Sequence, residues 1–86
     1  MEFVIDGKNM TDRRSAHEEI ARALSFPAFY GHNLDALFDL LSTFEGKVVL
    51  QNTKDALNNL GAYGLSIFKT FMDAKEENRF FSIIFD

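Results

Sequence analysis

The sequence predicts an α/β domain, in which a small three-stranded parallel sheet packs with about four helices. Three short apolar runs, at residues 2–5, 47–51 and 80–85, are rich in the β-branched and aromatic residues that strands favour. The segments between these runs carry apolar residues at helical spacing and are long enough to cross over the sheet. We therefore expect the order β-α-α-β-α-α-β, with right-handed connections between parallel strands.

Length and composition fit a single domain over residues 1–86. Hydrophobic residues make up 47% of the chain and include ten Phe, which can fill one modest core. The chain has no cysteine, which excludes disulfides, thiolate nucleophiles and cysteine-bound zinc. Because neither a signal-peptide pattern nor a run of 18 apolar residues follows Met1, we expect a soluble, cytoplasmic protein that does not bind membranes.

The charge of the chain bears on the kind of partner. A net charge of −4 attracts basic proteins and repels nucleic acid. The nine Lys and Arg residues are dispersed, without the basic stripe of a nucleic-acid-binding surface. We therefore expect no direct binding of nucleic acid.

The first strand should end at a turn over Asp6 and Gly7, before a helix that runs to about Leu24. Three residues are candidate N-caps: Thr11, Asp12 and Ser15. The apolar stripe of this helix recurs at i, i+4, i+7 and i+8: Ala16, Ile20, Ala23 and Leu24. Its charged residues are expected to face solvent: Glu18, Glu19 and Arg22. His17 on this helix is expected to be a structural residue, and Pro27 prevents the helix from continuing.

The loop after this helix leads into a central helix. Gly31 permits a positive φ angle in the loop, and Asn33 can cap a helix from about Leu34 to Ser42 or Phe44. Apolar residues gather in one sector of the helix: Leu34, Leu37, Phe38, Leu41 and Phe44. Polar residues fall within about 60° of one another on the opposite side: Asp35, Asp39 and Ser42. One side should build the core while the other presents two carboxylates.

Helix stability does not explain the pair of Asp35 and Asp39. Like charges at i and i+4 destabilise an isolated helix by about 0.2–0.5 kcal/mol, and Asp is a mediocre helix former. Three interpretations stay open: a solvated helix face, a carboxylate pair for acid–base or metal chemistry, and a face that binds a basic protein. The second has the least support, because a small helix face offers neither a deep cleft nor further clustered ligands.

Two side-chain types beside the central helix have ordinary structural interpretations. The aromatic pair Phe29 and Tyr30, next to Pro27, is more typical of core or loop packing than of a partner contact. His32 is expected to be a solvent-exposed titratable residue of the loop.

The second half of the chain continues the alternation of helix and strand. Gly46 should close the central helix, and the strand at residues 47–51 lacks polar alternation, as is typical of a strand covered on both faces. Thr53 can cap a short helix that Gly61 ends. The last helix, over residues 63–77, should carry its large apolar residues on one side: Leu65, Phe68, Phe71 and Met72.

The run from Phe29 to Asp39, Phe-Tyr-Gly-His-Asn-Leu-Asp-Ala-Leu-Phe-Asp, resembles the central loop and second helix of the barstar family, intracellular inhibitors of barnase-type bacterial ribonucleases. Other segments resemble the family in the same order along the chain: residues 4–7, the helix that carries His17, and residues 48–50, 71–75 and 83–84. The resemblance covers nearly the whole chain, and it implies the same fold of three strands and four helices.

The resemblance also implies roles for individual residues. In the family, the residue matching Asp39 enters the phosphate-binding pocket of the nuclease and meets its Arg and His side chains. The position of Phe29 holds a Tyr that touches the nuclease, and Gly31 and Asn33 match positions of the binding loop.

Other matching positions differ from the family. Phe38 and Phe44 stand where the family commonly has Trp, His32 takes the position of a Glu, and Asp73 matches a Glu that pairs with a basic residue of the nuclease. Together with the polar side of the central helix, the resemblance gives these expected partner-binding residues: Phe29, Gly31, Asn33, Asp35, Phe38, Asp39, Ser42, Phe44 and Asp73.

The function that the resemblance implies is inhibition of a basic, secreted ribonuclease through a one-to-one complex that blocks the active site. The inhibitor would have no catalytic activity, cofactor or metal of its own, and would be a monomer when free. The alternative is a barstar-fold interaction or regulatory module whose acidic helix binds a different basic protein. The departures at Phe29, His32 and Phe38 keep this alternative open.

Overall fold

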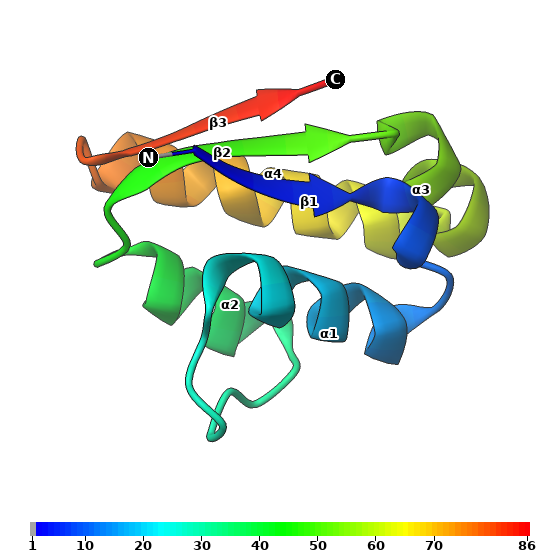
Figure 1. The fold of residues 1–86 in the computed structure, drawn as a ribbon, viewed down its shortest axis with the longest axis horizontal. Coiled ribbons are helices and arrows are strands. Elements are labelled where there is room, and N and C mark those ends of the chain that lie inside the picture. Colours follow the sequence, from blue (N-terminus) through cyan, green and yellow to red (C-terminus); the bar gives the residue numbers. More distant parts are fainter. Residues whose placement is uncertain (1) are drawn as a thin grey trace.

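The computed structural model describes residues 2–86, and it contains the predicted alternation of strands and helices (Figure 1). In chain order the elements are β1 (Glu2–Asp6), a short 3-10 helix η1 (Gly7–Asn9), α1 (Arg13–Leu24), α2 (Leu34–Leu41), β2 (Gly46–Gln51), α3 (Thr53–Leu60), α4 (Ala62–Glu77) and β3 (Phe81–Phe85). The order β-α-α-β-α-α-β is thereby confirmed.

The three strands form one sheet in the order β1-β2-β3, and both strand pairs are parallel. In the register, Val4 lies opposite Val49, which in turn lies opposite Ile84. Parallel neighbours with intervening helices are what the long connections require. The predicted α/β class with a small parallel sheet is therefore confirmed.

Helices α1, α2 and α4 lie on one side of the sheet, and α3 lies beyond the end of β2 (Figure 1). Buried side chains of the strands point toward them: Ile5, Val48, Leu50, Phe81 and Ile83. The alternate residues point away, and Val4 and Ile84 remain 40% and 46% exposed. The expectation that the second strand is covered on both faces is therefore wrong, because only one face of the sheet has helices packed on it.

Helix α1 begins after Asp12, whose carboxylate accepts a hydrogen bond of 2.8 Å from the Ser15 amide. Glu19 of this helix was expected to face solvent, and this is wrong. The residue is only 5% exposed, and its carboxylate accepts a hydrogen bond from the Asp6 amide at 2.9 Å and pairs with Arg22 at 2.6 Å. Burial by itself raises the pKa of Glu19, but these hydrogen bonds outweigh it and hold the pKa below the usual value. Glu19 joins α1 to the end of β1.

Helix α4 buries a different stripe from the expected one. Phe71 is fully buried and Phe68 is half-buried, but Leu65 and Met72 are 60% and 45% exposed. The fully covered positions are Gly64, Ile67, Phe71 and Ala74. Because α4 packs against both α2 and the sheet, its buried side is turned away from Leu65 and Met72.

Two helix ends differ from the prediction. The central helix ends at Leu41, and Gly46 with φ 145° opens β2 instead of closing that helix. Thr53 is the first residue of α3, and its hydroxyl donates to the Asp86 carbonyl at 3.0 Å. The cap position falls to Asn52, whose amide donates to Asp6 at 2.9 Å and makes no cap hydrogen bond. Contacts between the strand ends thus replace an ordinary N-cap.

Candidate functional site

Helix α2 is anchored through its apolar side. Leu37 and Leu41 are fully buried, and the helix packs against α4. Asn33 caps it as predicted, since its side-chain oxygen accepts the Ala36 amide at 2.8 Å. The Asn33 amide also donates to the Gly31 carbonyl at 3.2 Å, which joins the helix start to the preceding loop.

The opposite side of α2 presents Asp35 and Asp39 one turn apart, and both are exposed. Neither carboxylate takes part in an ion pair within residues 2–86. Ser42 does not extend this pair, because its hydroxyl lies 2.9 Å and 2.8 Å from the carbonyl oxygens of Phe38 and Asp39. The Ser42 hydroxyl therefore donates to carbonyl groups at the end of the helix. The two carboxylates remain free for an external partner.

A hollow of about 230 Å³ lies between the loop and α2, lined by Phe29, Tyr30, Gly31, Ala36, Asp39 and Leu40. It brings together three predicted site residues, two from the loop and one from α2. Phe29 is 81% exposed, whereas Tyr30 is buried, so the expectation of loop or core packing is confirmed for Tyr30 and wrong for Phe29. The hollow has mostly apolar walls and one carboxylate at Asp39.

A side chain at Gly31 would press on the neighbouring Asn33 side chain. A Cβ at this position would lie 3.0 Å from the Asn33 side-chain nitrogen and 3.5 Å from the Ala36 Cβ. The positive φ angle expected at Gly31 occurs instead at His32, with φ 53°. His32 can hold it because its Nδ1 lies 2.9 Å from the Tyr30 carbonyl, a local contact that helps to fix the turn.

The loop before α2 contacts His17 of α1, which is fully buried. Its Nδ1 lies 2.5 Å from the Tyr30 hydroxyl and its Nε2 lies 2.6 Å from the Tyr63 hydroxyl. Burial, with a smaller effect from nearby His32, lowers the pKa of His17 to about 4. The predicted structural role of His17 is confirmed. Its contact with Tyr63 could not be predicted from local sequence, because Tyr63 belongs to a helix that is far from His17 in the chain.

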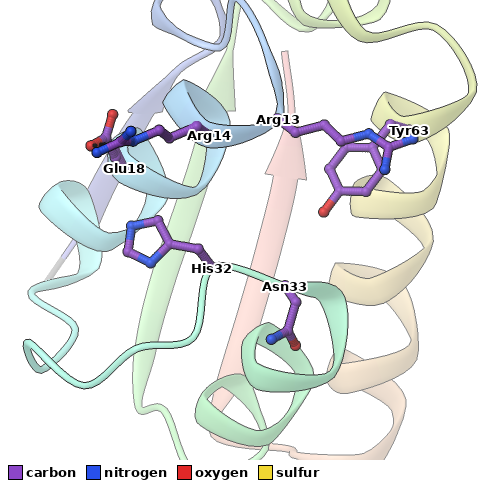
Figure 2. A pocket seen from close by; sticks show the side chains of 6 residues that line it. All are labelled: Arg13, Arg14, Glu18, His32, Asn33 and Tyr63. Atoms are coloured by element: carbon purple, nitrogen blue, oxygen red, sulfur yellow. Dashed lines mark ion pairs between the residues drawn. The ribbon is translucent and has the colours of Figure 1, made fainter.

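A second hollow, of about 580 Å³, opens beside the start of α2 (Figure 2). It is lined by Arg13, Arg14, Glu18, His32, Asn33 and Tyr63. Arg14 pairs with Glu18 at 3.6 Å, while the Arg13 guanidinium carbon lies 4.3 Å from the centre of the Tyr63 ring. Arg13 also lines a smaller hollow with Asp35. The acidic side of α2 therefore has a cationic border, which sequence reasoning missed.

Comparison with known proteins agrees with this architecture. Residues 1–85 match the family described as Barstar (barnase inhibitor). The chain belongs to the barstar family. It is also 32% identical over 78 residues to a protein of Bacillus subtilis (strain 168) named "Putative ribonuclease inhibitor YrdF", with 87% of this chain and 86% of that protein covered. Membership of the barstar family indicates an inhibitor rather than an enzyme.

Three more of the predicted barstar-type site residues lie apart from the hollow at Asp39. Phe38 is half-buried against the core, and Phe44 packs between Phe3 and Phe81 with ring centres 5.1 Å and 6.1 Å away. Asp73 on α4 accepts a hydrogen bond of 2.9 Å from Lys69. Phe44 therefore packs within the fold, and the Asp73 carboxylate is paired with a Lys of its own helix.

The described part of this barstar-family chain has neither a metal-binding cluster nor a membrane-spanning helix. Residues 2–86 contain no group of three or more His, Asp and Glu side chains placed to hold a metal ion. None of the helices there is long and apolar enough to cross a membrane.

Proposed function

We propose that this barstar-family protein inhibits a basic, secreted ribonuclease of the barnase type by binding it one-to-one and covering its active site. The contact surface consists of α2 and the loop before it. The observation that carries the proposal is the Asp39 carboxylate, which is exposed on a helix anchored by its opposite side and lines a hollow with Phe29 and Gly31.

The chemistry of this surface suits a site that binds phosphate. A ribonuclease places cationic side chains where the RNA phosphate lies, and a carboxylate accepts the same charge-assisted hydrogen bonds, two at once from an Arg. The hollow at Asp39 is mostly apolar with one negative group, so a flat cationic side chain fits its chemistry. Asp35, one turn earlier, adds a second negative charge on the same side.

The surface is also fixed before binding. Leu37 and Leu41 anchor α2 in the core, and the contact between Tyr30 and His17 anchors the loop. A surface that is already ordered loses less conformational entropy when it binds. Phe29, which is 81% exposed, offers an apolar ring next to the carboxylate.

The family description and the name of the Bacillus subtilis relative support an inhibitor of ribonuclease. An inhibitor of a secreted nuclease protects the producing cell only if it binds before export. We therefore place the protein in the cytoplasm of the cell that makes the nuclease.

The test is capture followed by an activity assay. Immobilised wild-type protein should retain from the native host a basic protein that cleaves RNA once released, and adding wild-type protein should stop that cleavage. Asp39→Ala should retain far less of it. Capture of a protein that cleaves no RNA, lost in the same way with Asp39→Ala, would contradict inhibition and favour the interaction-module alternative. Capture of no protein through Asp39 would contradict both.

A further inference from the structure

Arg13 stands at the border between the acidic side of α2 and the larger hollow (Figure 2). Its guanidinium carbon lies 4.3 Å from the centre of the Tyr63 ring, and it makes no ion pair within residues 2–86. Its neighbour Arg14, by contrast, is paired with Glu18. An Arg that is held on an aromatic ring, with its fork of donors free, can bind a further acceptor with little loss of side-chain freedom.

We propose that Arg13 binds a carboxylate side chain of the inhibited ribonuclease at the rim of the interface. The inference rests on the proposed function, because only a nuclease seated on α2 would bring its rim to Arg13 beside Asp35. The partner would then have a basic cleft bordered by an Asp or Glu. A nuclease with Lys or Arg at that point would be disfavoured, so Arg13 determines specificity.

An acidic side chain fits this border better than the phosphate of an RNA. Asp35 lines the smaller hollow with Arg13, and the whole chain carries a net charge of −4. Both repel a polyanion, whereas a single carboxylate can approach Arg13 from a protein whose nearby Arg or Lys meets Asp35. Arg13, Asp35 and Asp39 place one positive and two negative charges on this side. A protein partner that complements them presents charges of the opposite sign at the matching positions.

Charge alone gives the opposite result from a specific contact, which makes the test decisive. The protein is acidic and the expected nuclease is basic, so loss of one positive charge should leave binding unchanged or strengthen it. If Arg13 holds a carboxylate, its loss should weaken binding in spite of this trend. A remote Lys variant then reports the charge effect alone.

Dissociation constants would be measured for the full-length protein with the ribonuclease recovered in the capture assay. We expect Arg13→Gln to bind at least about tenfold more weakly than wild type and Arg13→Lys to fall between them. Lys47→Gln is the matched control, because Lys47 is exposed on the sheet face that points away from the helices. It should bind as tightly as wild type or more tightly. Thermal unfolding of each variant checks that all are folded.

The nuclease side completes the test. Each Asp and Glu around its cleft would be changed to Ala, and one of these changes should abolish the difference between wild type and Arg13→Gln. Equal binding of folded Arg13→Gln and Lys47→Gln would overturn the inference, as would Arg13-dependent binding of an RNA oligonucleotide. A wild-type protein that inhibits normally in that case leaves the proposed function standing. A wild-type protein that inhibits no ribonuclease removes both.

Discussion

His17 is the residue on which the shape of the candidate binding loop depends. Its two ring nitrogens contact the hydroxyls of Tyr30 and Tyr63 while the ring is fully buried. A neutral imidazole can donate through one nitrogen and accept through the other, and a hydroxyl can do either. Protonation would make both nitrogens donors and place a charge in the core. The neutral form is therefore part of the folded structure.

This predicts a dependence of stability on pH. The pKa of His17 is lowered from 6.5 to about 4 in the folded chain, so between these values the unfolded chain binds more protons. The free energy of unfolding should be highest above pH 6.5 and fall by up to about 3 kcal/mol as the pH drops toward 4. Urea denaturation at a series of pH values measures it.

The two histidines of the chain provide the control. His32→Asn should keep most of the pH dependence, because burial is the main cause of the lowered pKa of His17 and Asn tolerates a positive φ angle. His17→Gln should remove most of it between pH 4.5 and 6.5, whatever the starting stability of that variant. An unfolding free energy that stays constant between pH 4.5 and 6.5 in the wild type would contradict this account of His17.

A second prediction contrasts Glu19 with its neighbour Glu18. Glu19 is buried and accepts the Asp6 amide, so Glu19→Ala leaves that donor without its partner and should cost roughly 2–3 kcal/mol of stability. Glu18 is exposed, and within residues 2–86 its one ion pair is with exposed Arg14, so Glu18→Ala should change stability by less than about 0.5 kcal/mol. Equal losses in denaturant titrations would show that the contacts of Glu19 carry no particular weight.

At the scale of the secondary-structure elements, α2 has one side that packs in the core and another that we propose for binding. Leu37 is fully buried, so Leu37→Ala should lower the free energy of unfolding by about 2–5 kcal/mol. Asp39 is exposed and one turn from Asp35, so Asp39→Ala should leave stability unchanged or slightly higher. Thermal melting of both variants tests the division. If Asp39→Ala melted far below wild type, the carboxylate would be structural.

The elements also show what the sequence could and could not predict. Strong local signals placed α2 well, because Asn33 is a good cap and the apolar spacing from Leu34 onward is regular. The side of a helix that becomes buried depends on its neighbours. Glu19 lies inside because it meets the end of β1, and Leu65 lies outside because α4 turns toward α2 and the sheet. Contacts between elements that are far apart in the chain cannot be predicted from the spacing of apolar residues within one helix.

The same distinction applies to the candidate site. The acidic pair on α2 was predictable from helical periodicity, and the exposure of Asp35 and Asp39 agrees with it. The cationic border was not predictable, because it depends on Arg13 meeting Tyr63 across two helices that are far apart in the chain. The surroundings of Glu18 and Glu19, both expected to face solvent, were equally unpredictable: Glu18 lines the larger hollow and Glu19 is buried.

At the scale of the whole molecule, charge should govern how fast a complex forms. The chain has a net charge of −4, and its two carboxylates on α2 face a partner expected to be basic. Complementary fields raise the rate of encounter, and salt screens them over about 10 Å at 0.1 M ionic strength. The association rate constant should fall clearly as salt rises, while the dissociation rate constant changes less. Stopped-flow mixing with the captured ribonuclease measures both, and association that ignores salt would argue against a charged interface.

If α2 places Asp39 in a ribonuclease active site, the inhibition constant for RNA cleavage depends on that carboxylate. Asp39→Ala should weaken inhibition of RNA cleavage by about 2–5 kcal/mol, the range for truncating one member of a buried charge pair, for which the barnase–barstar complex is itself a reference case. Glu2→Ala removes the same charge from an exposed position on β1, where Glu2 pairs with exposed Lys47 at 3.5 Å, and should change inhibition by less than about 0.5 kcal/mol. Inhibition that weakens equally in both variants, or in neither, would contradict the assignment of this helix as the inhibitory surface.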